Sequence, residues 1–92
     1  MLYYKYMNEL ERVLKAMANR RRLALIKHLR SQREASVGEL AEAIKLSLKA
    51  TSKHLVILHN LGIVERDQRS LLMYYRLADP LPRPVKSLLS YL

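Results

Sequence analysis

The stretch SVGELAEAIKLSLKATSKHLVILHNLG, residues 36–62, determines the fold expected for this chain. Ser36 and Glu39 stand three apart at its start, with the Ser-x-x-Glu spacing of a capping box that begins a helix. Leucine, alanine and isoleucine side chains then recur at helical spacing. The stretch therefore opens with a short capped helix, predicted over 37–44.

A second helix follows after a short turn. Ser47 is a preferred N-cap residue, and Gly62 suits the position just past a helix end. Between them the leucines keep helical spacing, which predicts a helix over 48–61. Two short helices joined by such a turn form a helix-turn-helix unit, whose second helix enters the major groove of double-stranded DNA. Residues 36–61 are expected to be such a unit.

After Gly62 the pattern changes from helical to alternating. Residues 63–68 and 72–77 carry β-branched or tyrosine side chains at alternate positions, which is typical of strands. They predict a β-hairpin over 63–77, the wing that reaches along the DNA backbone or into the minor groove. Ser70 is not the Gly or Asn that a tight hairpin turn prefers, so a looser tip is expected.

The N-terminal end of the second helix carries the side chains that we expect to face DNA. Lys49 and Lys53 can donate hydrogen bonds to guanine, and Ser52 can pair with several bases. Leu48 is expected either to touch a thymine methyl group or to pack on a neighbour. Thr51 is retained as a candidate although its spacing places it on the inward side. With the wing arginines included, the candidate DNA-contacting residues are Ser47, Leu48, Lys49, Thr51, Ser52, Lys53, His54, Arg66 and Arg69.

Two helices are expected before this unit. Apolar residues recur at helical spacing over 3–17, and Asn19 is a preferred N-cap for the next helix. Residues 20–22, all arginine, fill the first turn of that helix, where the helix dipole disfavours cations. A nearby phosphate and a solvated charged turn explain this cluster equally well. Residues 31–35 are expected to form a polar loop.

The two ends of the chain are candidates for a dimer interface. A proline-rich connection over 79–84 leads to a last short helix over 85–92. A chain this short buries a modest share of its surface, so apolar stripes at both ends suggest burial by a second copy. We expect 1–18 and 82–92 to be dimerisation helices, and a core role for the first stripe is the alternative. The candidate interface residues are Tyr3, Tyr6, Leu10, Leu14, Val85, Leu88, Leu89 and Leu92.

Composition predicts one basic domain over residues 1–92. The 17 Lys and Arg residues against 8 Asp and Glu give a net charge of +9. Such an excess attracts polyanions, although solubility alone also explains it. The chain has no cysteine, which excludes disulfides and thiolate metal sites and is compatible with a reducing cytoplasm. No apolar run approaches the ~18 residues of a membrane helix, so no membrane partner and a cytoplasmic location are expected.

Four segments resemble, in order and spacing, the ArsR/SmtB family of winged-helix repressors. They are KAMANRRRL at 15–23, LSLKATSKHL at 46–55, VILHNLGIV at 56–64 and MYYRL at 73–77. The resemblance spans about two thirds of the chain. It implies a mainly α winged helix-turn-helix fold with a small β-hairpin, and dimers that pair their first and last helices. It also implies binding to imperfect palindromes in promoters, and members of the family often release DNA when an effector binds.

The chain departs from the family pattern at several positions. Arg20 stands where the family has Pro, Leu48 where it often has Gln, Val56 where it has Lys, and Ser70 where the wing has Gly. His54 matches a family histidine, and the resemblance implies a place near the helix-turn-helix unit from which it reaches a phosphate. A structural role inside the fold is the alternative that we favour for His54.

Neither a metal site nor an active site is expected. The family's Cys-x-Cys and Asp-x-His-x-x-His metal motifs are absent, and His54 and His59 lie five apart on one helix, a spacing that does not suit chelation. Two glycines cannot build a glycine-rich phosphate loop, and the carboxylates are scattered. The predicted chain is thus not an enzyme and has no cofactor, and any small-molecule effector stays unknown.

The leading functional hypothesis is a sequence-specific DNA-binding repressor that acts as a homodimer. The first alternative is a non-specific nucleoid or architectural protein, which the +9 charge favours. The second is a protein-interaction module, favoured by Leu48, Val56 and Leu71 if they are exposed. RNA binding lacks the aromatic platform that it commonly uses.

Overall fold

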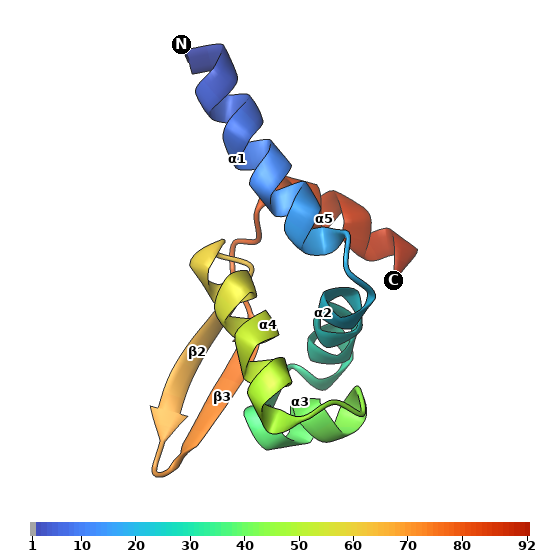
Figure 1. Ribbon diagram of the computed structural model, residues 1–92, viewed down its shortest axis with the longest axis vertical. Coiled ribbons are helices and arrows are strands. Elements are labelled where there is room, and N and C mark those ends of the chain that lie inside the picture. Colours follow the sequence, from blue (N-terminus) through green and yellow to red (C-terminus); the bar gives the residue numbers. More distant parts are fainter. Residues whose placement is uncertain (1) are drawn as a thin grey trace.

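The computed structural model describes residues 2–92. Three helices pack against a small antiparallel sheet, and two more helices lie together at the opposite end of the molecule (Figure 1). This is the winged helix-turn-helix arrangement, so the predicted fold class is confirmed. In chain order the elements are α1 (Leu2–Met17), α2 (Arg20–Gln32), β1 (Glu34–Ser36), α3 (Val37–Ala43), α4 (Leu48–Asn60), β2 (Val64–Arg69), β3 (Leu72–Leu77), α5 (Arg83–Leu88) and a 3-10 turn η1 (Leu89–Tyr91).

The starts of α2, α3 and α4 are fixed by the capping residues that the sequence indicated. Asn19 Oδ1 accepts hydrogen bonds from the backbone N–H groups of Arg21 and Arg22, at 3.0 and 3.1 Å. Ser36 and Glu39 form the reciprocal capping box, with bonds of 3.2 and 2.8 Å. Ser47 Oγ accepts from the backbone N–H of Ala50 at 3.1 Å. Each cap satisfies backbone donors that a helix leaves unpaired at its start.

A third strand replaces part of the polar loop predicted over 31–35. Helix α2 continues to Gln32, Arg33 turns the chain with a φ of 68°, and β1 then pairs antiparallel with β3. The strand order is β1-β3-β2, which puts β3 in the centre. The loop prediction is therefore wrong for 31–32 and for 34–35. A strand of three residues is too short for its alternation to stand out in a sequence.

The tip of the β2–β3 hairpin is tighter than predicted. Arg69 pairs directly with Leu72, which leaves only Ser70 and Leu71 in the turn. Ser70 adopts the left-handed conformation, with a φ of 58°. A left-handed serine costs roughly 1–2 kcal/mol, and the flanking strand pairs outweigh that cost. The expectation of a looser tip was wrong.

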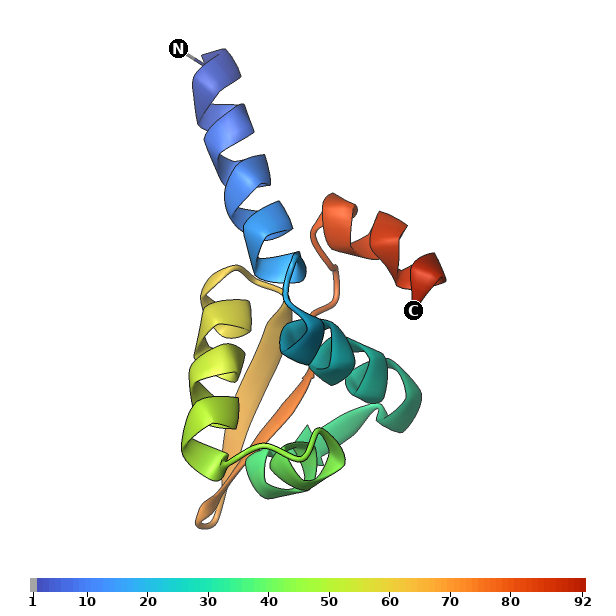
Figure 2. The same cartoon turned by 45° about the vertical axis from the view of Figure 1, so that its right-hand side comes forward.

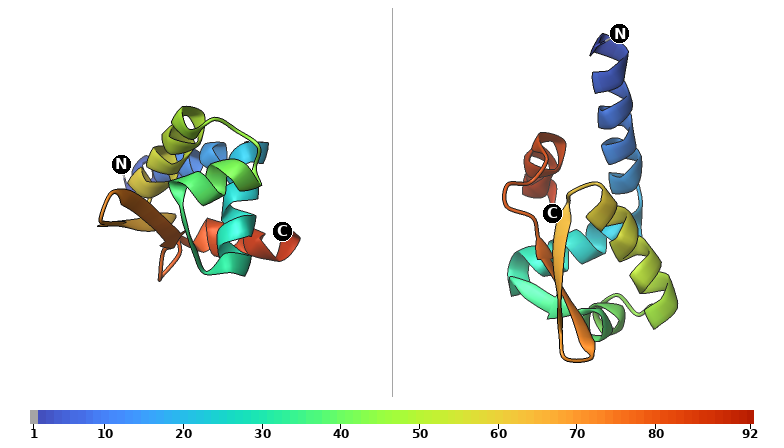
Figure 3. Two further views of the ribbon diagram at one scale, coloured as in Figure 1. Left: turned by 90° about the horizontal axis from the view of Figure 1, so that it is seen from below. Right: turned by 90° about the vertical axis from the view of Figure 1, so that its left-hand side faces the viewer.

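One hydrophobic core joins all the layers. It lies between α2, α3, α4 and the sheet, and α5 contributes one fully buried residue, Val85. Seen along the long axis of the molecule, the hairpin lies to one side of the three-helix cluster (Figure 3). The N-terminal half of α1 projects away from this body (Figure 2). The largest fully buried side chains are Leu25, Ile26, Leu29, Leu40, Leu55, Leu58, Ile63, Val64 and Val85, with Thr51.

Candidate nucleic-acid interface

Helix α4 has one buried face and one face open to solvent. Thr51, Leu55 and Leu58 are buried on the inner face. Lys49 and Lys53 are exposed on the outer face, and the helix carries no Asp or Glu. A cationic outer face with nothing on the helix to neutralise it is suited to a polyanion.

The first turn of α4 presents most of the residues predicted to touch DNA. Ser47 and Lys49 are exposed, and Ser52 is half-buried. Leu48 is 56% exposed, so packing against a neighbour covers less than half of it. Val56 is also exposed and lies seven residues, close to two turns, after Lys49, which places both on one stripe.

Thr51 is a correction to the predicted set. Its side chain is fully buried, and its Oγ1 has no hydrogen-bond partner. A side chain packed into the core between the helices cannot reach a base edge without unfolding of α4. The spacing that placed Thr51 on the inward side was right, and its inclusion among DNA-contacting residues was wrong.

His54 is held by an arginine rather than left free. Arg22 Nη1 lies 3.2 Å from His54 Nδ1, and Arg22 Nε donates to the backbone oxygen of Ala16 at 2.7 Å. Burial lowers the pKa of His54, and the charges of Arg22 and Arg21 lower it further. An unprotonated Nδ1 can accept the bond from Arg22, so this arrangement favours the neutral imidazole. The contact ties α1, α2 and α4 together.

The wing separates its two candidate arginines. Side chains alternate along β2, so Arg66 shares a face with the buried Val64 and projects on the side of the sheet that packs against α4. Arg69 points to the opposite face. Its guanidinium donates two 2.8 Å bonds to the Glu34 carboxylate and lies 4.7 Å from the ring centre of Tyr74.

Arg69 is therefore engaged within the protein, whereas we expected it to be available for DNA. A further bond to Asp67 Oδ2 at 3.2 Å adds to the ion pair with Glu34. These bonds raise the pKa of Arg69 and lower the pKa of Glu34. The pairing of Glu34 and Arg69 joins β1 to β2 across the central strand. Sequence spacing missed this contact because the two residues are far apart in the chain.

The wing tip and the first turn of α4 lie at the same end of the molecule, and the free end of α1 lies at the other (Figure 1). The exposed Lys49 belongs to that first turn of α4. Within residues 2–92, no group of three or more His, Asp or Glu side chains could hold a metal ion. No helix of the described chain is long and apolar enough to cross a bilayer.

The predicted dimer residues fall into three groups. Tyr3 and Tyr6 are 69% and 62% exposed on the projecting part of α1, and Leu14 is also exposed. Val85 is fully buried in the protomer's own core, which contradicts its place in an interface set. Leu10, Leu88, Leu89 and Leu92 are half-buried.

An apolar groove of about 390 Å³ lies between α1 and the C-terminal helices. Leu14 and Leu23 line it on one side, and Leu88, Tyr91 and Leu92 on the other. The groove leaves apolar surface of both chain ends open to solvent in the protomer.

The fold and the exposed basic helix define a winged helix-turn-helix protein. Over residues 19–66 the sequence matches the family described as bacterial regulatory protein, arsR family. The transcriptional activator HlyU of Vibrio cholerae is 40% identical over 67 residues, 73% of this chain and 61% of that protein. The chain thus spans about three fifths of that relative. This chain belongs to the ArsR family of bacterial regulatory proteins.

Solved structures of related regulators have the same fold. Reduced HlyU from Vibrio cholerae superposes with a TM-score of 0.79 at 34% identity, over 97% of this chain and 90% of that one. A homodimeric winged helix-turn-helix fragment of Mb0332 from Mycobacterium bovis gives 0.81 at 30% identity, over 97% and 79%. The transcriptional repressor BigR from Xylella fastidiosa gives 0.75 at 31%, over 97% and 91%. HlyU is named a transcriptional activator, BigR a transcriptional repressor and Mb0332 a possible transcriptional regulator.

Proposed function

We propose that this chain binds double-stranded DNA with α4 in the major groove and the wing against the adjacent backbone. The observation that carries this proposal is the outer face of α4. It presents Leu48, Lys49 and Lys53 without a carboxylate, and Arg66 is exposed on the wing. Lysine can donate to guanine or phosphate, and an apolar side chain can contact a thymine methyl group.

The proposed binding unit is a homodimer. The exposed tyrosines of α1 and the apolar groove between α1 and the C-terminal helices are surfaces that a second copy would bury. The Mycobacterium bovis relative is described as homodimeric. A two-fold dimer of this kind presents two recognition helices ~34 Å apart, so the expected site is an imperfect palindrome.

The proposed regulatory role is repression. A DNA-bound dimer can block a promoter by occupancy alone, which needs no further contact with other proteins. The relatives carry both descriptions, since HlyU of Vibrio cholerae is named an activator and BigR of Xylella fastidiosa a repressor. A binding site is first selected from random duplexes by its affinity for the protein. Transcription in vitro from a promoter that holds this selected site then separates the two roles: a fall in transcript supports repression, and a rise contradicts it.

Sequence preference is proposed to come partly from apolar contacts. Leu48 and Val56 are exposed on the outer side of α4, where the resembling family has polar residues. Both would meet thymine methyl groups in the major groove. Replacing thymine by uracil in the selected site removes the methyl alone. Loss of about fourfold in affinity per contacted methyl is expected.

The experiment that tests α4 compares two double variants. Lys49→Ala with Lys53→Ala removes two charges from α4, and Arg83→Ala with Lys86→Ala removes two exposed charges from α5. DNA binding is measured by fluorescence anisotropy over a salt series. The α4 variant should bind more weakly, and its plot of log affinity against log salt concentration should be shallower by about 0.9 for each phosphate contact that is lost. The α5 variant lies in a proposed dimerisation helix, so light scattering first checks that it is dimeric, and as a dimer it should bind as the parent does. Equal losses would contradict a recognition role for α4.

Two other outcomes point to other functions. Equal affinity of the parent for its selected site and for scrambled DNA would favour the architectural alternative, because specific binders exceed their non-specific affinity by ~10³ or more. No DNA binding at low salt would leave a protein-interaction module.

A further inference from the structure

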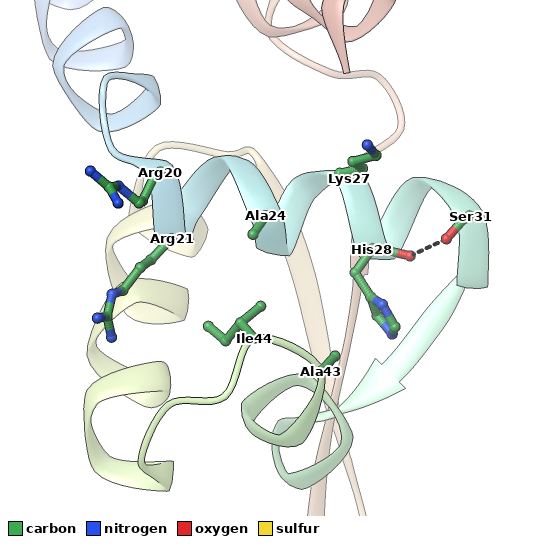
Figure 4. Close-up of a pocket in the computed structure, with 8 residues that line it drawn as sticks. All are labelled: Arg20, Arg21, Ala24, Lys27, His28, Ser31, Ala43 and Ile44. Atoms are coloured by element: carbon green, nitrogen blue, oxygen red, sulfur yellow. Dashed lines mark hydrogen bonds between the residues drawn. The ribbon is translucent and has the colours of Figure 1, made fainter.

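A groove between α2 and α3 is not part of the face assigned to DNA. It has a volume of about 510 Å³ and opens to solvent beside the turn that leads into α4 (Figure 4). Helix α2 contributes most of its lining, and the end of α3 contributes the rest. The lining residues are Arg20, Arg21, Ala24, Lys27, His28, Ser31, Ala43 and Ile44.

The rim of this α2–α3 groove is cationic. Arg20, Arg21 and Lys27 line it, and no carboxylate does. Within the described chain, none of these three side chains has a carboxylate partner within 4.0 Å, because the ion pairs present involve other cations. On α3, the Glu39 carboxylate is engaged with the backbone N–H of Ser36 in the capping box. Cations without carboxylate partners along this part of α2 favour an anion beside it.

The floor of the groove is apolar. Ala24 on α2 and Ala43 on α3 lie on opposite sides of it, and Ile44 projects into the space between them (Figure 4). The space exists because both helices carry the short side chain of alanine here, and a longer side chain at either position would reduce its volume. An apolar floor below charged groups is the usual makeup of a small-molecule site.

We propose that the α2–α3 groove binds a small aromatic carboxylate, with the ring on the alanines and the carboxylate on the cationic rim. Arg21, which projects on the α3 side of the groove (Figure 4), is the expected partner of the carboxylate, since a guanidinium group binds it through charge-assisted hydrogen bonds. The proposal does not depend on DNA binding, because it rests on the shape and charge of the groove.

The position of the groove gives its occupant a route to α4. Ile44 is the residue that ends α3, and Lys45 follows with a φ of 54° in the turn before α4. Arg21 also lies close enough to His54 of α4 to lower its pKa. A bound molecule that moves Ile44 or Arg21 would therefore change the position of α4 relative to the rest of the domain. This second statement rests on the proposed DNA-binding function.

The site is tested without DNA by titrating the labelled protein with three probes and following backbone amide shifts by NMR. Benzoate combines a ring with a carboxylate, benzyl alcohol keeps the ring alone, and inorganic phosphate keeps an anion alone. Benzoate should shift amides of 20–31 and 43–45, with a dissociation constant on the order of millimolar, as expected for so small a ligand. The other two probes should bind about tenfold more weakly.

Two variants separate shape from charge. Ala24→Leu fills the groove with a good helix former and keeps every charge, and Arg21→Ala removes the cation that faces it. Each should weaken benzoate binding about tenfold, while Lys5→Ala on α1 should leave it unchanged. Three results would each overturn the proposal: shifts that map to the apolar groove between α1 and the C-terminal helices, equal binding of benzyl alcohol, or an Ala24→Leu variant that binds as the parent does.

A DNA arm distinguishes the proposed occupant from the DNA backbone. If benzoate changes DNA affinity in the parent but not in Ala24→Leu, the groove is coupled to α4. The opposite result is that phosphate binds the groove as tightly as benzoate does and that DNA shifts the same amides. The cations would then contact DNA, and the proposed small-molecule site would be overturned. Absence of any DNA binding would contradict the proposed function and leave the benzoate result to stand alone.

Discussion

Arg22 Nη1 on α2 lies 3.2 Å from His54 Nδ1 on α4, and the same guanidinium bonds to the backbone of α1 through Nε. One side chain thus connects three helices at the back of the proposed recognition helix. Its neighbours Arg20 and Arg21 remain exposed. The arginine cluster therefore divides into one structural residue and two free cations.

The first prediction concerns pH. The pKa of His54 is lower in the folded protein than in the unfolded chain. The free energy of unfolding is therefore at its full value when the pH is above the pKa of the unfolded state, and part of it is lost as the pH falls through the folded pKa. Chemical unfolding at pH 8, 7, 6 and 5 should show stability declining toward acid. His54→Gln keeps an acceptor for Arg22 but cannot titrate, and its decline should be shallower. Parallel profiles for the two proteins would contradict this role of His54.

Thr51 gives a prediction about the buried, unpartnered hydroxyl. Thr51→Val replaces it with an apolar group of nearly the same shape. The free energy of unfolding should stay constant or rise by up to ~1 kcal/mol, because no hydrogen bond is lost. DNA affinity should not change. A variant that is stable but binds DNA weakly would show that the hydroxyl contacts DNA after all.

The two wing arginines should behave differently. Arg66→Ala removes an exposed cation on the side of α4, so it should lower DNA affinity and reduce the salt slope. Arg69→Ala removes the pairing with Glu34 and should leave the salt slope nearly unchanged, with a smaller loss of affinity from a less restrained wing. Anisotropy titrations of both variants at several salt concentrations make the comparison. A larger change in slope for Arg69→Ala would reverse the assignment.

The dimer interface is tested by placing a charge on each end of the molecule. Leu14→Glu should convert the dimer to a monomer of 10.8 kDa, because the glutamate would enter the apolar groove. Leu71→Glu adds the same charge at the exposed wing tip and should remain dimeric. Light scattering after gel filtration reads the mass directly. A parent protein that is monomeric at micromolar concentration would contradict the proposed dimer.

Local signals in the sequence predicted most of the fold. The N-caps at Asn19, Ser36 and Ser47 and the glycine at Gly62 act within a few residues, so their positions follow from the sequence alone. Strand β1 escaped prediction because its three residues are paired with a distant strand. The conformation of Ser70 is likewise set by the pairing of the two strands that it joins.

The candidate site was predictable in its position and less so in its details. Helical spacing placed Lys49 and Lys53 on the outer face of α4, where the structure has them. Spacing could not show that Arg69 reaches Glu34 or that Arg22 reaches His54, because each contact joins elements remote in sequence. Val85 was assigned to an interface since an apolar stripe does not tell a protomer's own core from a partner's.

The most direct test of the central claim is anisotropy of the parent protein with the DNA upstream of its own reading frame and with a scrambled duplex, over one salt series. The proposed function predicts a preference of ~10³ or more for the upstream DNA that persists at physiological salt. Equal affinity for both duplexes, with a steep salt slope throughout, would contradict sequence-specific recognition by α4.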